Sequence, residues 1–439
     1  MLLYAIQETP RLQYITAFIS KEIFREAIRI TTSKDHYIVH KGPKINYSPA
    51  EISDAEFWIM STELLFQKDI KEQSVQCFNH KDYKAFFKTT TGSNFAFDIL
   101  AAIFYLLSRY EEYLPHQKDD YGRFAHTNSL AFKENFLHLP IINIWLEDLK
   151  KELHYHYPEL GFRFRRFTFL PTYDIDMAYS YLHKGWWRNL GGSVRSVLDG
   201  DWRLLKERLT VLQGKMMDPF DSYEWLDGLH LYCRVKAYYF FLVASKRMKH
   251  DKNIDPESEA METLIKYHAS GYQVGIHPSW QSGDHEILLK QEIEWLGYLV
   301  NKKVDSSRQH YIRLSLPETY LRLIRLGIRK EFSMGYGSIN GFRASVASSF
   351  YWYDLANENS SDLLIYPFCF MDANAYYEEK LTAKQALEEL MWYYHQIKKV
   401  NGLMVTIWHN NFLGNDQHLA GWKKVYETFL KEEVFWDRT

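Results

Sequence analysis

The side chains of this chain that are suited to chemistry fall where its expected strands end. Two aspartates close an apolar run at residues 172–176 (TYDID), and a histidine closes a later run at residues 274–277 (VGIH). Because the carboxyl ends of parallel strands share one rim, residues spread over 235 positions of sequence can meet in one cleft. The residues at these ends are Asp174, Asp176, His277, Arg308, His310, Asp372 and His409.

The two aspartates suggest a metal ligand beside a base. Asp174 and Asp176 are two positions apart on an extended segment, so their side chains share a face. Two close carboxylates raise one another's pKa unless a cation lies between them. One carboxylate binding a metal while the other takes a proton satisfies this condition. The alternative is a solvated strand end or turn, where aspartate is also common.

The histidines and arginines each have a functional and a structural interpretation. Neutral imidazole ligates zinc and similar metals, which suits His277 (VGIHPSW) and His310 (SRQHYI), although either could be structural. His409 follows an apolar run in TIWHNNF and could be a partly exposed acid or a hydrogen-bonded core residue. Arg308 and Arg343 (GFRAS) could orient a carboxylate bidentately or form surface ion pairs.

The aromatic content is high, at 73 of 439 residues or 17%, which indicates a large core, flat rings that line a sugar site, or both. A few rings lie beside the expected rim, among them Trp352. The candidate substrate-binding residues are Arg343, Tyr336, Trp408 and Trp280. The aromatic residues among them could equally belong to the core.

The elements that must position these residues alternate between strand and helix after residue 160. Apolar runs at 163–176, 237–244, 363–370 and 403–408 predict strands, and the run AYYFFLVA at 237–244 is typical of a strand buried on both faces. Helical patterns separate them, for example at 284–300 and 382–399. The class is α/β with a parallel sheet or barrel. Residues 1–155 are expected to form a smaller α+β N-terminal domain with helices near 53–66, 97–113 and 141–154, and residues 160–439 the second domain.

Composition excludes several classes of function. Lys and Arg number 53 against 55 Asp and Glu, so the basic excess of a nucleic-acid binder is missing. Neither a GxGxxG nor a Walker loop nor a nucleophile elbow is found. The three cysteines are far apart and fit a reducing compartment. Neither a secretory signal nor a transmembrane segment is recognisable, so we expect a soluble, cytoplasmic protein.

Taken in order, these motifs resemble those of the NodB-homology polysaccharide deacetylases, over about residues 165–415. The roles that the resemblance implies are general base for Asp174, metal ligand for Asp176 and His277, support of the base for Arg308, a fourth-motif position for Asp372 and general acid for His409. The motifs DID, GIHPSW, SRQHY, GFRA and WHN look like a subgroup with an uncharacterised N-terminal domain, and FYLLSRYEEYLP at 104–115 has the look of that domain.

One position departs from the family pattern. The second motif of the family has another histidine four residues after the first, and Gln281 stands there in this chain. His310, which replaces a proline of the third motif, is the candidate for the missing ligand. The predicted metal ligands are therefore Asp176, His277 and His310.

The resemblance implies a distorted (β/α) barrel and a metal-dependent hydrolase that removes N-acetyl or related acyl groups from an amino sugar or polysaccharide. The cofactor would be one divalent metal, zinc first, with cobalt, nickel or manganese as alternatives. A second hypothesis is a decayed deacetylase that binds carbohydrate or protein, which Gln281 supports. A glycoside hydrolase comes last, because two aspartates on one strand face are too close for inversion, which needs about 6.5–9.5 Å.

Overall fold

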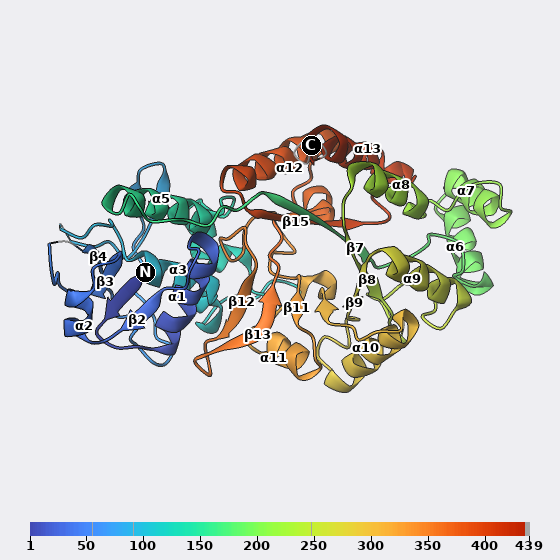
Figure 1. The fold of residues 1–439 in the computed structure, drawn as a ribbon. Helices are drawn as coiled ribbons and strands as arrows, with labels where there is room; N and C mark the ends of the chain where they lie inside the picture. The colour runs from blue at the N-terminus through green and yellow to red at the C-terminus, as the bar shows by residue number, and fades with distance from the viewer. Residues whose placement is uncertain (55, 91, 247, 435–439) are drawn as a thin grey trace.

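The computed structural model describes residues 1–434 except 55, 91 and 247, and a nine-stranded sheet occupies its larger part (Figure 1). The strand order is β12-β13-β11-β10-β9-β8-β7-β15-β14, and every neighbouring pair is parallel except β12 with β13. The strands are β7 (Thr168–Ile175), β8 (Tyr238–Leu242), β9 (Gln273–His277), β10 (Ser306–Ser307), β11 (Lys330–Glu331), β12 (Phe350–Asp354), β13 (Asn359–Ile365), β14 (Phe370–Met371) and β15 (Leu403–His409).

Side chains cover both faces of this sheet, as the apolar run at 237–244 predicted. Along β8, Phe240 packs into a small cluster with Phe332 and Phe368, whereas Tyr239 and Phe241 belong to the large core on the other face. In a strand, successive side chains point to opposite faces, so an unbroken apolar run requires two apolar surroundings. The mixed α/β class is therefore observed. Within the described residues no pairing joins β12 to β14, and a closed barrel stays a prediction.

Helices connect the strands and lie outside them (Figure 1). They are α8 (Tyr223–Cys233), α9 (Glu259–Gly271), α10 (Glu286–Val300), α11 (Glu318–Arg325), α12 (Ala383–Lys399) and α13 (Trp422–Thr428). Helix α12 shows why they form: Thr382 and Gln385 make a capping box at its start, and Ala386, Leu390 and Ile397 bury one face. Between β7 and β8 the chain also forms α6 (Trp186–Leu198) and α7 (Trp202–Leu212), which pack on each other.

The N-terminal part has its own four-stranded sheet, in the order β2-β1-β3-β4, with all pairs parallel. It contains β1 (Leu2–Ala5), β2 (Arg29–Thr31), β3 (Lys44–Ser48), β4 (Phe57–Met60), α1 (Pro10–Ile23), α2 (Lys34–Val39), α3 (Ile99–Leu107), α4 (Leu130–Lys133), α5 (Ile141–His156) and the antiparallel pair β5 (Phe78–His80) and β6 (Tyr83–Ala85).

Two expectations for this part were wrong. Its main sheet is parallel, so its arrangement is α/β rather than α+β. A helix was expected over residues 53–66, but β4 lies there, because the apolar run FWIM is buried beside β3 as an edge strand. The division at residues 155–160 stays a prediction. Among the described residues no helix has the length and apolar character that crossing a membrane requires.

A buried ion network joins the N-terminal part to the large sheet. Glu112 accepts two hydrogen bonds from Arg343, at 2.6 and 2.9 Å, and one from Arg109, at 2.7 Å. All three side chains are at most 2% exposed. Burial alone would raise the pKa of Glu112, but Arg343 and Arg109 outweigh burial and hold this pKa at about 2.

Removing this carboxylate should destabilise the whole chain. Glu112→Gln leaves Arg343 buried without its acidic partner and removes one of the two carboxylates that pair with Arg109, so we expect a loss of about 3–5 kcal/mol in the free energy of unfolding, measured by urea denaturation. Since the folded pKa lies below the unfolded value of about 4.3, this contribution is present above that pH and is lost as the pH falls towards 2. Glu294→Gln, in an exposed pair with Lys290, is the control. An equally small effect of both substitutions would contradict the prediction.

Candidate metal and catalytic site

The carboxyl ends of the parallel strands surround a cavity of about 420 Å³. Asp174 and Asp176 reach it from the end of β7, and His277 from the end of β9. His310 follows β10, and His409 ends β15, where it lies opposite Asp174 in the strand register. The structure therefore gathers these five predicted residues around one space.

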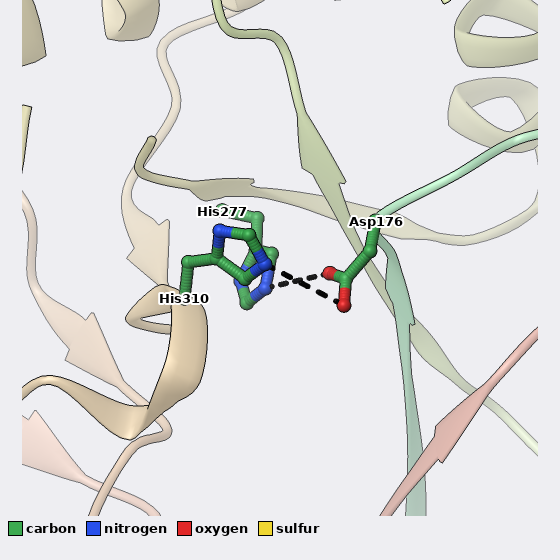
Figure 2. A group of neighbouring side chains, drawn as sticks. All are labelled: Asp176, His277 and His310. Carbon is green, nitrogen blue, oxygen red and sulfur yellow. Dashed lines mark ion pairs between the residues drawn. The ribbon is translucent and has the colours of Figure 1, made fainter. Parts of the chain in front are cut away.

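Asp176, His277 and His310 form a compact set of potential ligands (Figure 2). The Oδ1 atom of Asp176 lies 3.0 Å from His277 Nε2, and its Oδ2 atom lies 3.6 Å from His310 Nε2. One nitrogen or oxygen of each residue lies within 4.8 Å of the others. Ligands about 2.0–2.2 Å from a tetrahedral zinc ion are separated by about 3.3–3.6 Å, which is close to the two separations of 3.0 and 3.6 Å at Asp176.

The two imidazoles also present the right atom. His277 Nδ1 lies 2.6 Å from the carbonyl oxygen of Arg308, and this acceptor requires the proton to be on Nδ1. His310 Nδ1 lies 3.2 Å from Asp251 Oδ1, a fully buried carboxylate. Each bond leaves an Nε2 lone pair facing Asp176, which is the arrangement found behind metal-ligating histidines. These residues fit a divalent metal.

Asp176 and His310 shift one another's pKa within this set. Burial would raise the pKa of Asp176, but His310 and His277 outweigh it and hold that pKa well below its usual value. Burial would likewise lower the pKa of His310, but Asp176 and Asp251 raise it to about 9. A divalent ion among the three residues would take the place of such protons, because ligation needs neutral imidazole and ionised carboxylate.

Asp174 lies beside this set and is held from behind. Arg308 Nη1 lies 3.4 Å from Asp174 Oδ2, and Arg308 Nη2 donates a hydrogen bond of 2.9 Å to Thr172 Oγ1. Asp174 Oδ1 has no hydrogen-bond partner within the described part of the chain. Its Oδ2 is 4.0 Å from His277 Nε2. The side chain is thus kept near the ligands with one oxygen available to accept a proton.

His409 faces the same cavity and is paired with Asp372. Its Nδ1 donates to Asp372 Oδ1 over 2.6 Å, and its backbone N–H donates to Asp372 Oδ2 over 2.7 Å. Burial would lower the pKa of His409, but Asp372, aided by Asp176 and Asp174, raises it to about 10. His409 Nε2 lies 3.7 Å from Asp176 Oδ2, so a protonated nitrogen points into the site.

Arg308 and Asp372 were predicted as catalytic residues, and both are fully buried behind the cavity wall. Each contacts a cavity residue, Asp174 or His409, and neither lines the cavity itself. Their positions suit orientation of those two side chains rather than contact with a substrate.

The residues predicted to bind substrate lie elsewhere. Trp408 is fully buried against Tyr426, because it neighbours His409 on β15 and must face the opposite side. Tyr336 is 2% exposed, and Arg343 is engaged by Glu112. None of these three, nor Trp280, lines the cavity.

Neighbouring side chains pack on the Trp280 ring. Trp280 stacks on His250 at 4.2 Å between ring centroids, and the guanidinium of Arg313 lies 4.0 Å from its ring centroid. A sugar would need a free face of this ring. Trp280 does not line the cavity, and its role in substrate binding stays a prediction.

Several cavity residues were missed. Tyr121 and Arg123 come from the N-terminal part, and Tyr311 and Tyr377 from short helical turns that follow β10 and β14. Asp251, which holds His310, lies in the loop after β8. The rule that polar residues at strand ends meet at one rim could have selected Asp251, but nothing in the sequence indicated Tyr121 or Arg123. Gln281 does not line the cavity.

Comparison with known proteins gives three findings. A family of unknown function, DUF7033, matches residues 1–158. No curated protein matches the chain. Among solved structures, a proposed polysaccharide deacetylase from Mycobacterium smegmatis has 12% identity, covers 63% of this chain and 86% of its own, and gives a TM-score of 0.39. A polysaccharide deacetylase from Bacillus cereus has 13% identity, covers 61% and 89%, and gives 0.31.

Proposed function

We propose that this protein is a metal-dependent hydrolase that removes an acyl group from the nitrogen of an amino sugar or polysaccharide. The observation that carries the proposal is the set Asp176, His277 and His310, with both imidazoles anchored through Nδ1, between an acceptor, Asp174, and a donor, His409. A second part of the proposal is the distorted (β/α) barrel fold that the motif resemblance implies.

Each residue then has a step in amide hydrolysis. Asp176, His277 and His310 would hold a divalent metal, with zinc preferred over cobalt, nickel or manganese, and the metal would supply Lewis acidity towards a carbonyl oxygen and lower the pKa of water. Asp174 accepts the proton of the attacking water, and Arg308 holds that carboxylate in position. His409 donates its Nε2 proton to the leaving nitrogen, and Asp372 holds the ring in the protonated state.

A volume of about 420 Å³ lies within the range of small-ligand sites and suits a sugar unit. Tyr377, which is half exposed, and Tyr121 are aromatic residues of the cavity wall. They are the candidates for stacking on a sugar, the role that was expected of Trp280 and Trp408. The decayed-deacetylase hypothesis drew its support from Gln281, and the position of His310 beside Asp176 weakens that support.

The proposal is tested by metal analysis and an activity assay on the same preparation. We expect close to one zinc per chain by plasma mass spectrometry, and amine release from N-acetylated glucosamine oligomers. Chelation should remove both metal and activity, and added zinc should restore both. A chain that neither holds nor takes up a divalent metal would overturn the proposal.

The pH profile should report on the pair His409 and Asp372. In Asp372→Asn the neighbouring negative charge is lost, so the pKa of His409 falls from its raised value and the acid form persists only to lower pH. We expect the basic limb of kcat/KM to move down by at least about one pH unit. Asp362→Asn, on the exposed part of β13, should leave the profile in place. An unshifted limb in Asp372→Asn would remove His409 from the role of acid.

A further inference from the structure

The helical hairpin of residues 184–215 exposes apolar side chains to solvent and turns small or polar side chains inward. In α6 the apolar residues Trp186, Leu190, Val194 and Val197 recur along one stripe and are 44–63% exposed. The residues that face inward are small or polar: Ser196 is buried, and Asn189 donates a hydrogen bond of 2.9 Å to the Tyr181 carbonyl. The side that a core would normally cover is turned to solvent.

Helix α7 extends this apolar surface. Trp202 is 65% exposed, and Leu209 and Leu212 are nearly half exposed. Trp187, beside Trp186, adds a further exposed indole. Figure 1 shows both helices at one extreme of the molecule, on the side away from the N-terminal sheet. A surface of this kind marks an interaction site.

The charge of the hairpin favours an anionic partner. Residues 184–215 contain seven Lys and Arg against three Asp and Glu, in a chain whose net charge is −2. Arg203 and Lys206 are exposed and form no ion pair with any described residue, and Lys206 lies one turn from Trp202. A cavity of about 760 Å³ beside the hairpin is lined by two lysines and three arginines against two aspartates, which are Lys184, Lys252, Arg188, Arg195, Arg208, Asp199 and Asp201. Two copies of this surface would repel each other.

We propose that the 184–215 hairpin docks on an anionic lipid surface, with its indoles and aliphatic side chains at the interface and its basic residues on the headgroups. Exposed tryptophan with flanking Lys and Arg is the composition of interfacial helices. The basic cavity shares Met177 with the candidate catalytic cavity, so docking would bring the catalytic cavity close to the lipid.

Flotation of the full chain with vesicles tests this. We expect binding to phosphatidylcholine vesicles that contain phosphatidylglycerol, weakened by salt and by omission of phosphatidylglycerol. The triple substitution W186S/W187S/W202S and the pair R203E/K206E should each weaken binding at least about tenfold. I287S/Y298S, on the exposed face of α10, should bind like the unaltered chain.

Melting temperatures must match among the variants compared. Absence of binding, binding that these substitutions leave unchanged, or a hairpin-dependent dimer in light scattering would each overturn the proposal.

A second inference concerns the turn that carries His310. Tyr311 and Ile312 follow it with φ of 55° and 53°, which is the left-handed region that non-glycine residues rarely adopt. For Ile312, a β-branched residue, this conformation is strained, and it persists only where the surroundings enforce it. Ile312 packs into the cluster with Phe240 and Phe332.

The N-terminal part supplies the other restraint. Arg123 Nη1 donates a hydrogen bond of 2.6 Å to the Tyr311 carbonyl, while Asp119 accepts from Arg123 Nε over 2.7 Å. Tyr121 stacks on the Tyr311 ring at 5.4 Å. A Cβ at position 337 would lie 1.9 Å from Arg123 Nη1, so Gly337 leaves the space that the guanidinium occupies.

The geometry points to Arg123 as a positioning residue for the metal ligand His310, an inference that rests on the proposed function. Residues 1–158, which match a family of unknown function, would then help to position a ligand of a metal site in the other part of the chain. Loss of a group that orients a ligand typically lowers metal affinity about 10–100-fold.

Zinc affinity by chelator competition, together with the cobalt absorption spectrum, provides the test. We expect Arg123→Ala to weaken zinc about 10–100-fold and to alter the cobalt bands, with partial recovery in Arg123→Lys. His126→Ala is the matched control, since His126 contacts Ser338 across the same interface at 2.9 Å without touching the turn. Equal zinc affinities in the Arg123 and His126 variants would refute the positioning role of Arg123 and leave the proposed function intact. An unaltered chain that binds no metal would refute the proposed function itself.

Discussion

Replacing Asp174 by asparagine is expected to reduce kcat by about 10³-fold while zinc stays bound with nearly unchanged affinity. The substitution keeps the size of the side chain and an oxygen for the contact with Arg308, but it removes the basic group. Asp174 contributes no atom to the compact set of Asp176, His277 and His310, so metal binding should survive.

Steady-state amine release and metal content by mass spectrometry, on the same preparation, separate these two effects. Asp362→Asn, exposed on β13, is the control for a change of one charge. Full activity in Asp174→Asn would exclude Asp174 as the base. Loss of metal together with activity would make Asp174 a ligand instead, and the assignment of Asp176 would then need revision.

The second large effect is expected at His310. His310→Ala removes one of three proposed ligands and one of the two hydrogen bonds to Asp251 Oδ1, so zinc affinity should fall by at least about a hundredfold, beyond the loss of an orienting group. Chelator competition measures this fall, and activity at low zinc should disappear with it.

His250→Ala is the matched control for His310→Ala. His250 stacks on Trp280 close to the site but does not belong to the ligand set. If His310→Ala kept the zinc affinity of the unaltered chain, the missing histidine of the second motif would have no replacement at His310, and the decayed-deacetylase hypothesis would gain support.

The sequence was sufficient to predict which residues would meet, because strand ends follow from apolar runs. Asp174, His277 and His409 each stand directly at the end of such a run, and parallel pairing brings those ends together. The pairings Asp372 with His409 and Arg308 with Asp174 also join residues that the motifs had selected.

Strand parity is enough to correct one of the wrong predictions. Neighbouring residues on a strand face opposite ways, so a cavity-facing His409 already excludes Trp408 from the cavity. Tyr336 and Arg343 were less accessible to such reasoning, since their partners lie in another part of the chain: Arg343 pairs with Glu112, 231 positions away, and Tyr336 accepts a hydrogen bond from Arg109.

Local patterns also misled where tertiary packing decides. Residues 57–60, taken together with the residues on either side, show a helical spacing of apolar side chains. They nevertheless form β4, because an edge position beside β3 buries them. The contact of Arg123 with Tyr311 links a loop of the N-terminal part to a turn 188 positions away, and nothing in either sequence segment specifies it.

The buried network of Glu112, Arg109 and Arg343 has a consequence for how such chains can diverge. Because each part supplies charges that pair with those of the other, the two parts must be inherited together. A recombination that exchanged either part for one lacking the matching partner would bury an unpaired charge, at a cost of about 3–5 kcal/mol. Because natural proteins are stable by only about 5–15 kcal/mol, such a chimaera would lose a large fraction of its stability before selection could act on its chemistry.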